Sequence, residues 1–313
     1  MKIGLDIMGG DYAPNATVLG AIAAYPHLKE NQHMVLFGNK DQITPILKEQ
    51  NFNPDFFEYV DTTEVIGMGE HPTKAIVQKP NSSIAVGFQY LKEEKINSFA
   101  SAGNTGAMLV GSLFSVKAIS GVARPAISAI IPKSKGGFSI LLDAGANADC
   151  KPENLVQFSI MGSLYAKYVY QVENPKVGMM NIGEEEEKGN LLTQASYPLL
   201  KENSNINFIG NIEGRDLFNE KADVIVCDGF TGNVILKLAE SFYVLTLKKG
   251  MEDEFFDRFN YEQYGGSPIL GVNAPVIIGH GISSPEAIKN MMLLSRDMVE
   301  TKIVEKFKTA FNS

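Results

Sequence analysis

The sequence lacks the features of exported, metal-binding and nucleic-acid-binding proteins. It has two cysteines, Cys150 and Cys227, and no CxxC or Cys/His cluster, so we expect neither a disulfide framework nor a metal site. No secretory signal opens the chain, and we expect a reducing, cytoplasmic setting. Basic runs with interleaved aromatic residues are absent and the formal net charge is −8, so we expect no nucleic-acid partner.

Charged residues are also missing from residues 96–116, a stretch almost long enough to cross a bilayer. The stretch is nevertheless rich in polar and small residues, among them Asn97, Ser98, Gly111 and Ser112. Such residues would leave polar groups unsatisfied in lipid. We therefore predict a buried strand, a turn and a helix here.

Short apolar runs rich in β-branched residues alternate with helical patterns, which is typical of parallel strands joined by crossover helices. We predict an α/β fold with a mostly parallel sheet flanked by helices. No linker marks a boundary, so we expect a single domain over residues 1–313, with two lobes around a cleft as the alternative. The predicted strands cover residues 2–7, 33–38, 97–101, 126–131, 138–142, 176–181, 206–209, 222–227 and 275–278.

Two helical regions stand out in the second half of the chain. Ser284, Pro285 and Glu286 form a good N-terminal cap for a helix whose apolar positions continue to Phe307. Its apolar face predicts core packing, with a lipid- or partner-binding stripe as the alternative. Residues 232–260 predict a second helical stretch that breaks near Gly250.

Glycine-rich polar turns follow the predicted strands, and ligands of open α/β sheets bind at the carboxyl ends of strands. In residues 8–11 the glycines allow close approach of a ligand, and Asp11 either caps the helix near Pro14 or holds a substrate group. Residues 101–106 predict an anion-binding turn at a helix start, which is neither a Walker A loop nor a dinucleotide fingerprint. The candidate residues of that turn are Ser101, Gly103, Asn104 and Thr105.

Turns after later strands offer further candidates. Asp143 and Asn147 either bind a ligand or hold their own turn. The four acidic residues 184–187 predict a solvated helix start rather than a metal site, and the adjacent Lys188 is either a surface lysine or a cation directed into a strand-end pocket. In residues 228–233 the candidates are Asp228, Thr231 and Asn233, with Asn233 opening a helix.

Histidines are few, and one of them has an unusual setting. His280 lies between two glycines at a strand end, which makes it the candidate for acid–base or polar substrate contacts. The other three, His27, His33 and His71, have the pattern of surface residues.

Taken together, these segments resemble the PlsX family, the acyl-carrier-protein:phosphate acyltransferases of bacterial phospholipid synthesis. The resemblance spans almost the whole chain. Its parts are residues 8–11, 72–83, 101–107, 124–126, 143–147, 181–190, 208–216, 228–237, 264–266 and 280–281.

The resemblance implies a fold similar to isocitrate and isopropylmalate dehydrogenases and to phosphotransacetylase, built as a homodimer. It implies an acyltransferase that converts long-chain acyl carrier protein and inorganic phosphate to acyl phosphate, which a glycerol-3-phosphate acyltransferase then uses in phosphatidic acid synthesis. No organic cofactor is implied. Lys188 and Asn233 match the family's catalytic residues.

One segment departs from the family pattern. Many members carry a longer helical hairpin, linked to membrane docking, between the GFTGN and YGG motifs; here residues 234–263 form only a short helical protrusion. The resemblance therefore implies the chemistry, and peripheral contact with the inner face of the cell membrane is an alternative to a purely cytoplasmic location.

The residues alone leave two alternatives for the function. One is a phosphotransacetylase acting on acyl-coenzyme A, and the other is a non-catalytic scaffold that binds a phosphate ligand. Hydride transfer is disfavoured because no GxGxxG fingerprint follows the first strand.

Overall fold

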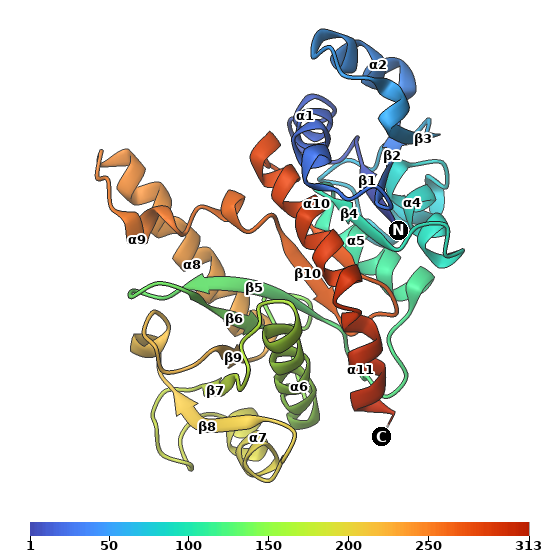
Figure 1. Cartoon of the computed structure of the whole chain (residues 1–313). Coiled ribbons are helices and arrows are strands. Elements are labelled where there is room, and N and C mark those ends of the chain that lie inside the picture. The colour runs from blue at the N-terminus through green and yellow to red at the C-terminus, as the bar shows by residue number, and fades with distance from the viewer. Residues whose placement is uncertain (313) are drawn as a thin grey trace. The chain divides into compact units, whose positions relative to one another are not determined.

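The computed structural model describes residues 1–312 and divides into two compact units. Unit 1 consists of residues 1–118 and 261–304, and unit 2 consists of residues 119–260 and 305–312. Unit 1 is therefore assembled from two separate stretches of chain, which Figure 1 shows in blue to green and in orange to red.

The strands of unit 1 lie in the order β3-β2-β1-β4-β11-β10. All neighbouring pairs are parallel except β10 and β11, which are antiparallel. Their bounds are β1 Lys2–Asp6, β2 His33–Gly38, β3 Phe57–Asp61, β4 Ser98–Ser101, β10 Ser267–Leu270 and β11 Val276–Ile278. Because β1, β4 and β11 are adjacent and parallel, the loops that follow them leave the sheet at the same edge.

Helices cover the strands of unit 1 through close contacts at small residues. Gly20 of α1 packs directly on Ile288 of α10, and these two helices lie side by side in Figure 1. Gly87 of α4 packs on the ring of Phe99 in β4. The helices of unit 1 are α1 Asn15–Ala24, α2 Lys40–Glu49, α3 Pro72–Gln78, α4 Ser83–Lys92, α5 Thr105–Gly111 and α10 Pro285–Glu300, with a π-helical segment over Ser112–Val116.

The strands of unit 2 lie in the order β5-β6-β9-β7-β8. The pair β5 and β6 is antiparallel, and the other neighbours are parallel. Their bounds are β5 Ala126–Pro132, β6 Phe138–Leu142, β7 Lys176–Met180, β8 Asn207–Ile212 and β9 Val224–Val226. The loops after β6, β9 and β7 therefore emerge side by side at one edge of this sheet.

Unit 2 also contains the longest helix of residues 1–312, α8 Gly229–Lys248, which begins directly after β9. The others are α6 Pro152–Tyr168, α7 Leu191–Lys201 and the short α9 Glu254–Asp257. The boundary between the units falls within α11 Ile303–Phe311. Short 3-10 turns cover Tyr25–His27, Pro54–Phe56, Gly214–Asp216 and Tyr261–Gln263.

The predicted fold class is confirmed, whereas two strands were not predicted. β3 is an edge strand in which the charged residues Glu58 and Asp61 are exposed, so it lacks an apolar run. β10 carries Pro268 at its second position, and proline is depleted in strands.

Two predicted helices have different limits. The C-terminal helix is interrupted after Glu300, because Lys302 has a φ of 52° and helical residues have negative φ. The other helix begins at Gly229, three residues earlier than predicted, so Asn233 lies within its first turns and does not open it. The acidic residues 184–187 form a loop rather than a helix start, and α7 begins only at Leu191.

The uncharged stretch 96–116 forms the predicted strand, turn and helix. Across the part of the chain that the structure describes, no helix has the length and apolar character needed to cross a membrane.

Candidate active site

In unit 1, hydrogen bonds join the loops after β1, β4 and β11. Asp11 N–H donates to the carbonyl of Gly281 at 2.7 Å, and Gly279 N–H donates to the carbonyl of Ser101 at 2.8 Å. The sequence-predicted residues of unit 1 thus gather at one edge of its sheet, as strand-end candidates should.

A buried carboxyl group, Asp6, organises two of these loops. Its Oδ2 accepts from Ser101 Oγ at 2.6 Å and its Oδ1 accepts from Met8 N–H at 2.9 Å. Ser101 Oγ in turn accepts from Gly103 N–H at 2.9 Å. Burial raises the pKa of Asp6 above its usual range, against the lowering effect of these hydrogen bonds. Sequence reasoning treated Asp6 only as part of a strand, although a lone acid in an apolar run before a glycine turn could have marked it.

Asn104 fixes the turn 101–106 to a neighbouring loop. Its side-chain oxygen accepts from Ala107 N–H at 2.9 Å and caps α5. Its amide nitrogen donates to the carbonyls of Gly67, Met68 and Glu70 at 3.0 to 3.1 Å. The side chains of Ser101 and Asn104 are therefore already hydrogen-bonded within the protein, while Thr105 is exposed.

Asp11 and His280 complete the unit 1 candidates. The N-cap residue of α1 is Pro14, so the interpretation of Asp11 as its cap is wrong; Asp11 lies three residues earlier and is exposed. His280 is half-buried, and its carbonyl accepts from Ser283 Oγ at 2.6 Å. The histidines predicted to be surface residues, His27, His33 and His71, are exposed.

In unit 2, a second buried acid, Asp143, holds the loop after β6. Its carboxyl oxygens accept from the backbone N–H groups of Ile127, Gly145, Ala146 and Asn147 and from the side-chain amide of Asn147, at 2.6 to 3.1 Å. Burial raises its pKa, and the N–H donors oppose that rise. Asn147 O accepts from Gly229 N–H at 2.7 Å, which ties this loop to the start of α8.

Asp228 is the N-cap of α8. Its carboxylate accepts from Thr231 N–H at 2.9 Å and from Thr231 Oγ1 at 2.8 Å. Of the unit 2 candidates, Asp143, Asn147, Asp228 and Thr231 thus hold the loops, and for Asp143 and Asn147 this is the alternative in which they hold their own turn.

Asn233 and Lys188 differ from those candidates because both are exposed. The side-chain amide of Asn233 makes one bond, to the carbonyl of Ala144 at 3.3 Å. Lys188 lies on the loop after β7, and its aliphatic stem packs against Gly183. Among the described residues, none places a carboxylate within ion-pair distance of the Lys188 ammonium group.

The conformation of the Lys188 loop depends on its neighbour Gly189. Gly189 has a φ of 101°, and a Cβ atom there would collide with Thr193 Oγ1 and with Asn181 Oδ1. Asn181 also donates from its amide to the carbonyl of Lys188 at 3.0 Å. The backbone of Lys188 is therefore fixed while its charged end is free to meet an anion.

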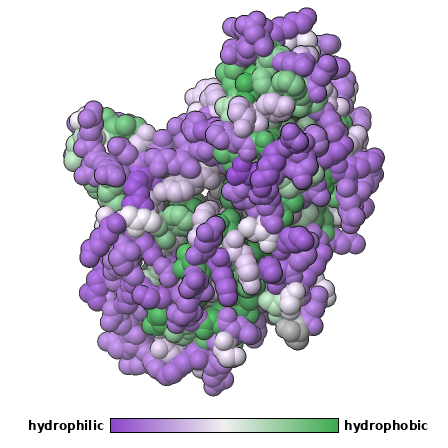
Figure 2. Space-filling model, viewed as in Figure 1, coloured by the Kyte–Doolittle hydropathy of each residue, from purple (hydrophilic) through white to green (hydrophobic). Residues whose placement is uncertain are grey.

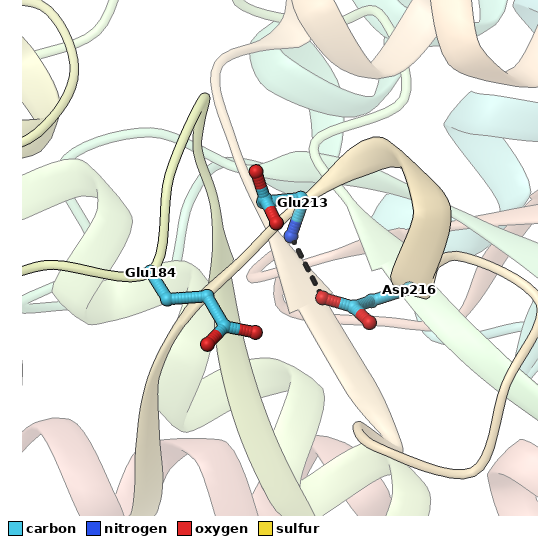
Figure 3. Close-up of side chains that lie close together, drawn as sticks. All are labelled: Glu184, Glu213 and Asp216. Atoms are coloured by element: carbon cyan, nitrogen blue, oxygen red, sulfur yellow. Dashed lines mark hydrogen bonds between the residues drawn. The ribbon is translucent and has the colours of Figure 1, made fainter.

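An acidic cluster lies on the same side of unit 2. Carboxylate oxygens of Glu184, Glu213 and Asp216 lie within 4.8 Å of one another, and Figure 3 shows them converging. Lys221 Nζ, however, contacts Glu184 at 2.6 Å and Asp216 at 3.0 Å. Arg215 pairs with Glu213, so each of the three carboxylates already has a basic partner and we assign no metal to this cluster.

A cavity of about 750 Å³ opens beside the Lys188 loop. It is lined by residues that follow β7, β8 and β9 and by one side of α8, including Gly189, Asn190, Asp228 and Thr231. Its size is within the range of small-molecule pockets. Sequence reasoning missed this cavity, because its lining comes from segments far apart in the chain.

Comparison with known proteins gives the family. A family model described as "Fatty acid synthesis protein" matches residues 1–256. The phosphate acyltransferase of Dictyoglomus turgidum is 44% identical, with 100% of this chain and 98% of that protein covered. The phosphate acyltransferase of Desulforamulus reducens is 46% identical, with 100% and 98% covered.

Solved structures support the fold. A phosphotransacetylase from Streptococcus pyogenes superposes with a TM-score of 0.66 at 14% identity, covering 96% of this chain and 94% of that one. EutD phosphotransacetylase from Staphylococcus aureus gives a TM-score of 0.65 at 14% identity, with the same coverage of each chain. The resemblance found in the sequence motifs is thus confirmed by matches over the full chain: this protein belongs to the phosphate acyltransferase family.

Proposed function

We propose that the protein transfers a long-chain fatty acyl group from acyl carrier protein to inorganic phosphate, and so supplies acyl phosphate for phosphatidic acid synthesis. The family supports acyl transfer with phosphate. The observation that carries the assignment of residues is the exposed ammonium group of Lys188, which pairs with no carboxylate of the described residues. It lies on the loop next to the one that leads into α8 and Asn233.

The chemistry needs positioning and charge stabilisation rather than a protein nucleophile. An oxygen of hydrogen phosphate attacks the thioester carbonyl carbon and the C–O bond forms. The C–S bond then breaks, and the leaving carrier thiolate takes up the proton that the phosphate gives up. In this proposal Lys188 neutralises phosphate or oxyanion charge, and the amide of Asn233 donates to the carbonyl oxygen. Asp143, Asn147, Asp228 and Thr231 act through the loops that they hold.

We assign phosphate binding in unit 1 to the backbone of the turn 101–106. Ser101 and Asn104 are bonded internally, and Gly103 N–H donates to Ser101. Thr105 and Gly106 begin α5, where N–H groups have no partner within the helix. In this proposal Asp11 and His280 border the turn without carrying the chemistry.

The decisive experiment is product analysis of wild-type protein and Lys188→Ala with long-chain acyl carrier protein and phosphate. Wild type should form acyl phosphate, and Lys188→Ala should lose at least about 100-fold in kcat without a change in melting temperature. Lys201→Ala is the matched control, because Lys201 is an exposed lysine of unit 2 that pairs with Glu186. Near-wild-type turnover of Lys188→Ala would remove Lys188 from the mechanism.

Two outcomes would favour the alternatives. Turnover with short acyl-coenzyme A but not with acyl carrier protein would indicate a phosphotransacetylase. Phosphate binding without acyl phosphate from either thioester would indicate a scaffold.

We further propose that the protein is a homodimer. Light scattering after size-exclusion chromatography tests this.

We also propose a peripheral membrane contact through the end of α8. Val244, Leu245, Leu247 and Met251 are each 46 to 56% exposed there, and Figure 2 shows hydrophobic surface on the α8 and α9 segment at the upper left. Flotation with anionic liposomes should carry the protein upward. A protein that stays at the bottom of the gradient contradicts the membrane contact.

A further inference from the structure

The cavity beside the Lys188 loop has an apolar interior. Leu155, Met180, Cys227 and Ala239 form its floor, and each is at most 9% exposed. Burial raises the pKa of the Cys227 thiol well above its usual value, so the thiol is neutral. Of the residues lining the cavity, Asp228 alone carries a carboxyl group and none is a lysine or an arginine; Asp228 is already bonded to Thr231. The interior therefore offers no cation for a phosphate group.

One stripe of α8 forms a wall of the cavity. Thr231, Ile235, Leu238, Ala239 and Phe242 all line it, and their spacing of 4, 3, 1 and 3 residues keeps them on one side of a helix. The stripe begins in the turn that contains Asn233 and runs along the helix for 11 residues, or about 16 Å at 1.5 Å per residue. An extended alkyl chain of about a dozen carbons has that length, taking about 1.25 Å per carbon from C–C bonds of about 1.5 Å.

The polar residues of the cavity lie where the reacting end of a substrate would be. Gly189 and Asn190 follow Lys188 directly, and Asp228 and Thr231 belong to the N-terminal end of α8. A molecule with a polar end at these residues and an apolar tail along the stripe would match the lining at both ends. A fatty acyl thioester has this character, whereas a short acyl group or a nucleotide would leave the apolar part unfilled.

We propose that this cavity binds the acyl chain of the substrate, with the tail along α8 and the thioester outside the cavity, past the N-terminal end of the helix, where it meets Lys188 and Asn233, and that Phe242 limits the chain length. The inference rests on the proposed function, because it takes the acyl thioester as substrate. It adds that chain-length preference is set within unit 2 by residues that take no part in the chemistry.

Two substitutions with opposite effects test the proposal. Ala239→Phe fills the cavity from its floor, and Phe242→Ala lengthens it. The control is Val244→Phe, since Val244 is exposed and lies on α8 but not among the lining residues. At about 100° per residue, Asn233 projects from the side of α8 opposite to the stripe, so neither substitution contacts it. The thioester carbonyl therefore reaches Asn233 only beyond the N-terminal end of the stripe.

The measurement is kcat/KM for acyl carrier proteins loaded with chains of 8 to 18 carbons, without vesicles. Each methylene group that is kept out of an apolar cavity lowers kcat/KM by up to about four-fold. We expect Ala239→Phe to lower the ratio of 16-carbon to 8-carbon activity by at least about ten-fold, Phe242→Ala to move the optimum to longer chains, and Val244→Phe to keep the wild-type profile.

The outcomes separate this inference from the proposed function. If wild type forms acyl phosphate but all three variants keep its chain-length profile, the cavity does not bind the chain. If wild type forms no acyl phosphate from any chain, the proposed function itself fails. Should Ala239→Phe lose its fold by circular dichroism, Phe242→Leu decides, because it shortens the side chain and keeps apolar contact with Phe218 and Phe259.

Discussion

Asn233 donates from its side-chain amide to the carbonyl of Ala144 at 3.3 Å, which joins the first turns of α8 to the loop after β6. The bond is long and Asn233 is exposed, so the amide can exchange this partner for a substrate oxygen at small cost.

We predict that Asn233→Ala lowers kcat by about 100- to 1,000-fold, as expected for loss of an oxyanion donor. Its free energy of unfolding should change by less than about 1.5 kcal/mol, because one weak hydrogen bond is lost. Steady-state kinetics and urea unfolding measure the two effects. Asn207→Ala removes a comparable bond at 3.5 Å in unit 2 and should keep full activity. A kcat within three-fold of wild type for Asn233→Ala would contradict the assignment.

The contact between α8 and the Asp143 loop should tolerate no added atom. A Cβ atom on Gly232 would collide with the carbonyl oxygen of Asp143. We expect Gly232→Ala to lower the free energy of unfolding by about 1 to 3 kcal/mol and to lower kcat, since α8 must move away from the loop. Gly69→Ala is the control because nothing lies within 4 Å of its Cβ position. Unchanged stability and activity of Gly232→Ala would show that this contact has room.

We predict that Asn104 positions the turn 101–106 for phosphate binding, in addition to stabilising the fold. Asn104→Ala removes a helix cap and the donor to three carbonyls, so we expect a loss of about 2 to 3 kcal/mol in stability and at least a five-fold rise in KM for phosphate. Asn273 also donates to three carbonyls, those of Val116, Lys117 and Ala118, in the same unit. Asn273→Ala should therefore lose stability without a change in KM for phosphate. Equal KM values for the two variants would refute the phosphate role of the turn.

The pH dependence of stability should report the buried carboxyl group of Asp6. Because its pKa is raised on folding, the folded state binds the proton more tightly than the unfolded state, and the stability contributed by the protonated form is lost as pH rises through the raised pKa. Asp6→Asn removes this titration. The new side-chain amide can still form a hydrogen bond with Ser101, by donating an N–H to Ser101 Oγ.

Urea unfolding of wild type and Asp6→Asn between pH 4 and pH 8 gives the measurement. We expect the stability of wild type, relative to the variant, to be greatest near pH 4 and to fall as pH rises above the ordinary aspartate value of 3.8. A difference that stays constant or rises with pH would show that the carboxylate is the favoured form in the fold.

The sequence allowed the strand-end turns to be predicted because they follow local rules: an apolar run, then glycines with Ser, Asn or Asp. It could not separate residues that hold a turn from those that meet a ligand. Asn104 and Lys188 are both next to glycines in the sequence. The amide of Asn104 donates to the carbonyls of Gly67, Met68 and Glu70, whereas the ammonium group of Lys188 pairs with no carboxylate of the described residues. Only contacts between distant segments make that distinction, and the same holds for the cavity between α8 and the loops after β7 and β8.

The division of unit 1 into two stretches has a consequence for the growing chain. β4 ends at Ser101, and its neighbour β11 begins at Val276, 175 residues later. At about 5 to 20 residues per second, one side of β4 stays without its partner for about 9 to 35 s of synthesis. All strands of unit 2 lie between Ala126 and Val226 and emerge within that interval. The sheet that the ribosome begins first is therefore the one it completes last.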